Sequence, residues 1–255
     1  MSSPTWTPAS LSPELRHYRE WVWRLVDAQY HVSLRKLTDS LAEQALLEGL
    51  VEGTKPAVPV ECRGLDPLLS TPFRYAPYPK GSRFRRAGPT SGVYYAAEDA
   101  RVAVAETAFY RLLFFAESPD TPWPVNPFEC TGFSVEVSSL HLLDLTEPPF
   151  DVYGSVWRHP VEYAPCQEFA DAARKGGAKI LRYWSARELK GGVCVAVLTC
   201  AAFSETYPAH GFETWRIGVT RTGAYAIREF PPDRLEFDRS YFASDPRIAS
   251  MRWDR

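Results

Sequence analysis

The sequence predicts an α+β protein with a mixed β core, flanking helices and an N-terminal helical extension. After residue 90, short strand patterns are mixed with only a few helical ones, which is typical of this class and not of a doubly wound sheet. The chain contains neither GxGxxG nor GxxxxGK[ST], so nothing indicates a Rossmann or P-loop fold. Leucines at helical spacing before residue 52 indicate the extension.

Residues 1–69 are expected to form the helical extension and a linker, and residues 70–255 the main domain. Ser12, Pro13 and Glu14 supply a hydroxyl N-cap, a first-turn proline and an acid, which predicts a helix over residues 12–29. A second helix ending at Gly53 is predicted from six leucines: Leu34, Leu37, Leu41, Leu46, Leu47 and Leu50. This apolar stripe needs a cover, and we expect the main domain to provide it, with a partner as the alternative.

In the main domain, a strand over 92–96 precedes a helix that opens at Glu98 and Asp99 and continues over 101–115. A further helix is expected over 166–174. The remaining strand patterns cover 133–137, 140–145, 180–183, 193–198, 215–220 and 225–230, and a turn at 221–224 joins the last two.

Composition excludes several classes of protein. The chain has 255 residues, 45% hydrophobic and 24% charged, so it contains enough apolar surface to fold. No apolar run approaches the ~20 residues of a membrane span, and no secretory signal is expected. A net charge of −2 argues against direct nucleic-acid binding. Scattered cysteines and histidines indicate no metal site. We expect Cys194 and Cys200 to be buried thiols in a strand, and the protein to be cytoplasmic.

Glu106 is the first candidate site residue, because its carboxylate lies at the border of an apolar helix stripe. Its helical neighbours are Val102, Phe109 and Leu113. Burying a carboxylate there costs several kcal/mol unless it is paired or hydrogen-bonded. The alternative is a surface glutamate paired with an arginine such as Arg101 or Arg111.

Arg83, Arg85 and Arg86 lie in a segment bounded by glycines, where alternate side chains of an extended chain share one face. A guanidinium fork matches a diphosphate; the alternatives are a solvated loop and, less favoured, a nucleic-acid contact. Ser185 ends a strand pattern beside aromatic residues and can donate to a ligand. Without GxSxG or a histidine partner it is a poor nucleophile, and an ordinary strand end is the alternative.

Taken together, these segments resemble the RES domain, a family named for its Arg, Glu and Ser. The first half is similar in Phe-Arg-Tyr at 73–75, Gly-Ser-Arg-Phe at 81–84 and Gly-Val-Tyr-Tyr-Ala at 92–96, with Glu106 eleven residues after Tyr95. The second half is similar in Tyr-Ala-Pro-Cys-Gln-Glu-Phe-Ala at 163–170, Gly-Gly at 176–177 and Tyr-Trp-Ser-Ala-Arg at 183–187. The resemblance covers roughly residues 70–230.

The resemblance implies an ADP-ribosyltransferase-like fold and a toxin of a RES–Xre toxin–antitoxin system. Such proteins consume NAD+ by phosphorolysis or hydrolysis of the nicotinamide bond, or by transferring ADP-ribose to a protein. It therefore implies NAD+ as substrate without a prosthetic group, phosphate or a protein as a possible acceptor, and an Xre-type antitoxin as partner. The family's functional positions fall on Arg74, Tyr75, Arg83, Tyr95, Glu106 and Ser185.

This chemistry agrees with the residue types. Cleavage of NAD+ releases neutral nicotinamide and builds positive charge on the ribose C1′, which a carboxylate in a dry pocket stabilises. We expect Glu106 in that role, Arg83 and Arg74 on the pyrophosphate or an incoming phosphate, Tyr75 or Tyr95 stacked on nicotinamide, and Ser185 bonded to the ribose or its neighbour. The hypothesis is an NAD+-degrading toxin. The alternatives are a mono-ADP-ribosyltransferase and a non-enzymatic interaction module that uses the N-terminal helices.

Overall fold

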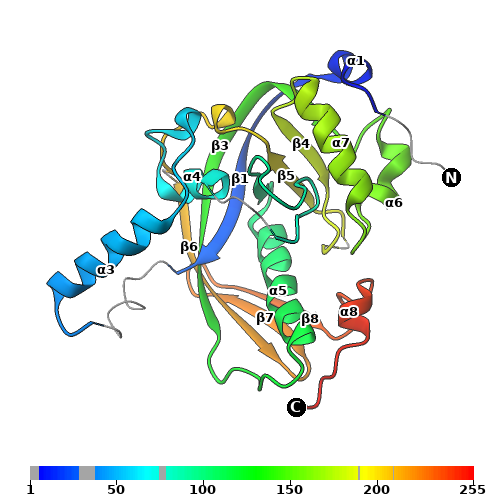
Figure 1. Cartoon of the computed structure of the whole chain (residues 1–255). Helices are drawn as coiled ribbons and strands as arrows, with labels where there is room; N and C mark the ends of the chain where they lie inside the picture. The colour runs from blue at the N-terminus through cyan, green and yellow to red at the C-terminus, as the bar shows by residue number, and fades with distance from the viewer. Residues whose placement is uncertain (1–5, 29–37, 75–78, 189, 209) are drawn as a thin grey trace.

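A computed structural model describes residues 6–28, 38–74, 79–188, 190–208 and 210–255 (Figure 1). Its centre is an eight-stranded mixed sheet in the order β1-β2-β5-β4-β3-β6-β7-β8. The strands are β1(Arg16–Asp27), β2(Tyr94–Ala97), β3(Phe128–Asp144), β4(Ile180–Trp184), β5(Val193–Val197), β6(His210–Thr220), β7(Gly223–Arg228) and β8(Asp233–Asp238). The β3–β4 pair is parallel and the other pairs are antiparallel. The predicted α+β class is confirmed.

Five of the strands close on themselves. Strand β1 pairs with β3 along nearly its whole length and also with β2, where Trp23 faces Ala97. Strands β1, β2, β5, β4 and β3 therefore form a ring, while β6, β7 and β8 extend from the first half of β3 as a wing. Figure 1 shows this wing below the ring.

The helices are α1(Pro8–Leu11), α3(Leu41–Thr54), α4(Pro67–Arg74), α5(Ala100–Glu117), α6(Gly154–Trp157), α7(Ala164–Lys175) and α8(Pro246–Ala249). Asp99 is the N-cap of helix α5, and its side chain accepts from the Arg101 N–H at 2.7 Å, which satisfies a free backbone donor. Helix α5 packs on β1, β6, β7 and α8, and α7 packs on α1 and α6.

Helix α5 joins two parts of the hydrophobic core. Its first turns, including Ala103, pack in a cluster with Phe169 of α7. The later turns, including Phe109, pack in a second cluster with Trp215 of β6. Glu106 lies on the turn between these two groups and is half-buried. The helix therefore places this carboxylate at the seam between the ring and the wing.

The predicted helix over residues 12–29 is wrong. The Ser-Pro-Glu start forms only a 3-10 turn, η1(Ser12–Glu14), after which Leu15 is extended and β1 begins at Arg16. The following residues are rich in Trp and Val, which favour a pleated, half-buried surface, and their pairing with β3 outweighs the local helix signal. Residues 16–27 thus belong to the main sheet and not to a helical extension.

The second predicted helix exists as α3(Leu41–Thr54), while Leu34 and Leu37 lie outside the described residues. None of its residues is buried, and Leu41, Leu46 and Leu50 are between 61% and 77% exposed. Figure 1 shows α3 projecting from the rest of the fold. The prediction that the main domain covers this stripe is therefore wrong for Leu41, Leu46 and Leu50, while Leu47 is half-buried.

The predicted linker contains a short 3-10 turn, η2(Val60–Cys62), and helix α4. A disulfide joins Cys62 to Cys200, which lies in η4(Cys200–Ala202) directly after β5. The expectation that Cys200 is a thiol in a strand is wrong, because the chain turns out of β5 at Val197 and brings this side chain to Cys62. Cys194 is a buried free thiol in β5, as predicted.

Most elements of the main domain follow the sequence pattern. Helix α7 confirms the prediction over 166–174, and the strands predicted over 180–183, 193–198 and 215–220 are present. The two patterns at 133–137 and 140–145 belong to one long strand, β3. In the part of the chain that the structure describes, no helix has both the length and the apolar character to cross a membrane.

Candidate active site

The segment around Arg83 is a tight loop held by a hydrogen bond within the loop and by Gln167 of α7. The Ser82 N–H donates to the Arg85 carbonyl at 2.7 Å, and Gln167 of α7 donates to the carbonyls of both residues. Gly81 has a φ of 67°, and a Cβ there would lie 2.8 Å from the Arg85 carbonyl oxygen, so glycine is required. The loop therefore presents Arg83 from a fixed backbone.

Arg83 points inward from this loop. The side chain is buried, its Nη1 donates to the Trp157 and His159 carbonyls at 2.6 and 3.0 Å, and its guanidinium lies 4.7 Å from the centre of the Tyr163 ring. These contacts fix one edge of the guanidinium. An anionic ligand would be bound by its other nitrogens.

The structure assigns Tyr95 a supporting position. Its hydroxyl shares a hydrogen bond of 2.8 Å with Ser82 and accepts from the Phe84 N–H at 2.9 Å. Burial raises the pKa of Tyr95 to about 12, so the phenol stays neutral near pH 7. Tyr95 thus contacts the residues on both sides of Arg83, through the Ser82 hydroxyl and the Phe84 backbone N–H. Its predicted stacking on nicotinamide stays a prediction.

Glu106 and Ser185 are in direct contact, although 79 residues separate them. The Ser185 hydroxyl donates to Glu106 Oε1 at 2.6 Å and accepts from the Arg187 and Glu188 N–H groups at 3.0 and 2.9 Å. The Cys194 thiol lies 3.6 Å from the same carboxylate oxygen. Ser185 is fully buried, so the Glu106 carboxylate is held in one orientation.

The charges of Arg83 and Glu106 both influence the pKa values of two buried side chains, Tyr183 and Cys194. Burial raises the pKa of Tyr183 well above its ordinary value; the Glu106 charge adds to the increase and Arg83 opposes it. Burial likewise raises the pKa of Cys194, and the charges of Glu106 and Arg83 again act in opposite directions. The Phe84 ring lies 4.9 Å from the Tyr183 ring, which links the arginine loop to β4. The predicted arginine, glutamate and serine therefore form one cluster with opposite charges in an apolar setting.

The structure adds Arg187, to which the sequence reasoning gave no role. Its guanidinium pairs with the fully buried Asp245 at 3.0 Å, donates to the Tyr163 hydroxyl at 3.2 Å and lies 3.5 Å from the Phe109 ring centre. Arg187 thereby connects the segment that carries Ser185 with Tyr163, whose ring contacts Arg83, and with Asp245. Its place two residues after Ser185 was visible in the sequence, but its distant partner was not.

Arg74, Arg85 and Arg86 have side-chain partners outside this cluster. Arg74 donates to the Glu52 carboxylate at 2.6 Å and to the Pro56 carbonyl at 3.1 Å, so its guanidinium is directed to the end of α3. Tyr75 lies outside the described residues. Arg85 binds Thr90, and Arg86 pairs with Asp171 on α7. These contacts do not support Arg74 as part of an anion clamp.

Comparisons with known proteins identify a matching family and a solved structure with a similar chain. The model of the RES domain family matches residues 58–218, more than half of the chain. None of the curated proteins compared matches the chain. A chain of the crystal structure of the M. tuberculosis MbcT–MbcA toxin–antitoxin complex aligns with a TM-score of 0.43 and 14% identity, over 92% of this chain and 96% of that chain.

Proposed function

Because the chain belongs to the RES-domain family, we propose that it is an NAD+-degrading toxin of a toxin–antitoxin system. Its reaction is cleavage of the bond between nicotinamide and ribose, with water or phosphate as the acceptor. The observation that carries this proposal is the Glu106 carboxylate, which the buried Ser185 hydroxyl holds at 2.6 Å in an apolar seam shared with Arg83.

Departure of nicotinamide leaves positive charge on the ribose C1′ and ring oxygen. A carboxylate whose orientation is already fixed stabilises this charge without reorganisation, and it does so best where water is excluded. Ser185 fixes one oxygen of Glu106, and the Cys194 side of the site is buried. The apolar setting that makes a carboxylate costly in the folded protein is the setting in which it stabilises a cationic transition state most strongly.

Arg83 supplies the complementary charge. The Trp157 and His159 carbonyls and the Tyr163 ring hold its guanidinium in place, and Tyr95 holds the backbone that carries it. A preorganised guanidinium suits the pyrophosphate of NAD+ or an incoming phosphate, because it can donate two parallel hydrogen bonds. Arg83 is therefore assigned to anion binding.

The test is incubation of the purified chain with NAD+ that is radiolabelled in its ADP-ribose part, with and without phosphate, followed by separation of the products. Nicotinamide with free ADP-ribose indicates hydrolysis, and nicotinamide with phosphorylated ADP-ribose indicates phosphorolysis. Radiolabel on protein would instead indicate the alternative, a mono-ADP-ribosyltransferase.

Glu106→Gln keeps the size of the side chain but removes its charge, so turnover is expected to fall about 10²-fold or more. The matched control is Glu117→Gln on the same helix, where the carboxylate is 47% exposed and its charged partners are Lys80 and Arg247. An E106Q variant within about threefold of wild type would contradict the role of the carboxylate.

An enzyme that depletes NAD+ needs an inhibitor in the cell that makes it. We therefore expect a cognate antitoxin, of the Xre type that the resemblance implies. The measurement is co-purification of the chain with the product of a neighbouring gene, together with rescue of growth when both are expressed. Growth arrest by wild type but not by E106Q would tie toxicity to the reaction.

A further inference from the structure

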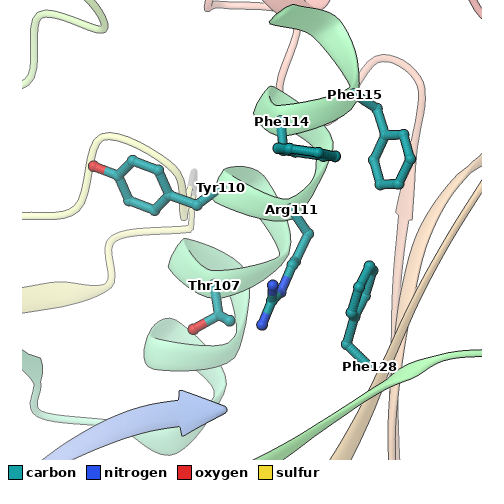
Figure 2. A pocket seen from close by; sticks show the side chains of 6 residues that line it. All are labelled: Thr107, Tyr110, Arg111, Phe114, Phe115 and Phe128. Carbon is teal, nitrogen blue, oxygen red and sulfur yellow. The ribbon is translucent and has the colours of Figure 1, made fainter. Parts of the chain in front are cut away.

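Helix α5 carries a second feature on its solvent-facing side, a half-open pocket of about 400 Å³ (Figure 2). Its lining consists mainly of aromatic side chains and one guanidinium: Thr107, Tyr110, Arg111, Phe114, Phe115 and Phe128. Pockets of this size accept a small aromatic molecule or one end of a larger ligand. The proposed chemistry of Glu106 does not use this pocket.

The lining is unusual for a surface helix. Tyr110 and Phe114 lie one turn apart, and each is 55% exposed, so two aromatic rings face water. Across the pocket, the Arg111 guanidinium lies 4.4 Å from the centre of the Phe128 ring and is paired with Asp27. One wall is therefore held in place, and the exposed Phe114 ring offers a flat apolar surface to a ligand.

Residues that line the pocket follow Glu106 directly along α5. Thr107 directly follows Glu106, and Tyr110 lies one turn further along the same helix. Figure 2 shows the Tyr110 side chain extending from the helix on the side opposite Phe128. The hydroxyl of Tyr110 is within the electrostatic reach of Glu106, Tyr163 and Arg83.

From Glu106 to Phe114 the helix advances about 12 Å. Two riboses and a pyrophosphate separate the bases of a dinucleotide by a distance of that order. A ligand with its nicotinamide ribose at Glu106 can therefore reach the pocket with its other base.

We propose that this pocket binds the adenine base of NAD+, which stacks on Phe114 while the linking ribose and phosphates pass Tyr110. The proposal rests on the proposed function and adds the determinant that distinguishes a dinucleotide from a mononucleotide. Adenine is flat, neutral and aromatic, which matches the Phe114 face and the largely apolar lining.

The experiment measures equilibrium binding of two ligands to the full chain by calorimetry. ADP-ribose contains the adenine end, and nicotinamide mononucleotide contains only the nicotinamide end. In Phe114→Ala, the ratio of the dissociation constants of ADP-ribose and nicotinamide mononucleotide is expected to rise about tenfold, the loss typical of truncating one base-stacking ring. Phe114→Trp retains a stacking face and is expected to restore the ratio.

Phe212→Ala is the matched control, because Phe212 on β6 is 57% exposed and lies outside the pocket lining. It is expected to leave the ratio of dissociation constants unchanged. An unchanged ratio in Phe114→Ala, while wild type binds ADP-ribose and cleaves NAD+, would overturn the adenine assignment and leave the proposed function standing. A wild-type chain that neither binds nor cleaves NAD+ would overturn both.

Discussion

Ser185→Ala is the substitution that tests most directly how the structure holds its carboxylate. The Ser185 hydroxyl makes three hydrogen bonds at a fully buried position: one to Glu106 and two from backbone N–H groups. Alanine removes all three and leaves a carboxylate oxygen and two amides without this partner. Each such loss costs about 1–3 kcal/mol, so with partial relaxation we expect a loss of about 3–5 kcal/mol in the free energy of unfolding.

For a chain of 255 residues, such a loss corresponds to a fall of roughly 10 °C in Tm. The catalytic effect has a separate cause. Without its donor, the Glu106 carboxylate can rotate, and a hydrogen bond to a charged group is worth about 1.5–3 kcal/mol, so kcat for NAD+ cleavage is expected to fall about 10- to 100-fold. Urea denaturation measures the first effect, and nicotinamide release below the Tm of the variant measures the second.

Ser134→Ala provides the control. Ser134 is also buried, at 4% exposure, but its hydroxyl donates a single bond to the neutral His210 carbonyl at 3.2 Å. A loss of only about 1 kcal/mol and an unchanged kcat are expected for it. The reasoning about Ser185 is refuted if both variants lose equal stability, or if Ser185→Ala keeps the wild-type kcat.

Two further predictions concern stability. Replacing both Cys62 and Cys200 by Ala removes a crosslink between residues 138 positions apart, and the free energy of unfolding is expected to fall by about 5 kcal/mol because the unfolded chain gains entropy. Wild type unfolded in reductant should be as stable as the variant. Equal stability of wild type with and without reductant would contradict the prediction. Asp245 is fully buried and paired with Arg187 and Arg247, so Asp245→Asn is expected to lower the free energy of unfolding at pH 7 by about 3–5 kcal/mol. Burial raises the pKa of Asp245, but the hydrogen bonds and charge of Arg247 outweigh burial and leave the pKa below its ordinary value. Its stabilising contribution is therefore complete above about pH 4 and is lost as the pH falls through the lowered folded pKa, so the variant should lose less stability than wild type in that range, and parallel acid limbs would count against this assignment.

Local patterns predicted many of the elements correctly. The helix that opens at Glu98 and Asp99, the helix at 166–174 and the core strands of the main domain depend on residues close in the chain, and the structure confirms them. The family resemblance also followed from short motifs in order, and the match over residues 58–218 confirms it. Local patterns misled where tertiary pairing overrode them. A good capping sequence at Ser12 starts no α-helix, because the following Trp- and Val-rich residues gain more by pairing with β3.

The sequence by itself determined which residue types are available to the site: an acid on an apolar helix stripe, an arginine between glycines, and a serine at a strand end. Only the tertiary structure decided which of them meet. Glu106 and Ser185 come together because α5 and β4 pack around a common core. The Arg187 N–H donates to the Ser185 hydroxyl, while the Arg187 guanidinium pairs with Asp245, 58 residues further along the chain. The family resemblance also predicted Arg74 as a site residue, yet its guanidinium binds Glu52 at the end of α3. Residue chemistry is local, but a hydrogen-bond partner depends on how distant segments pack, and neither spacing nor composition records that packing.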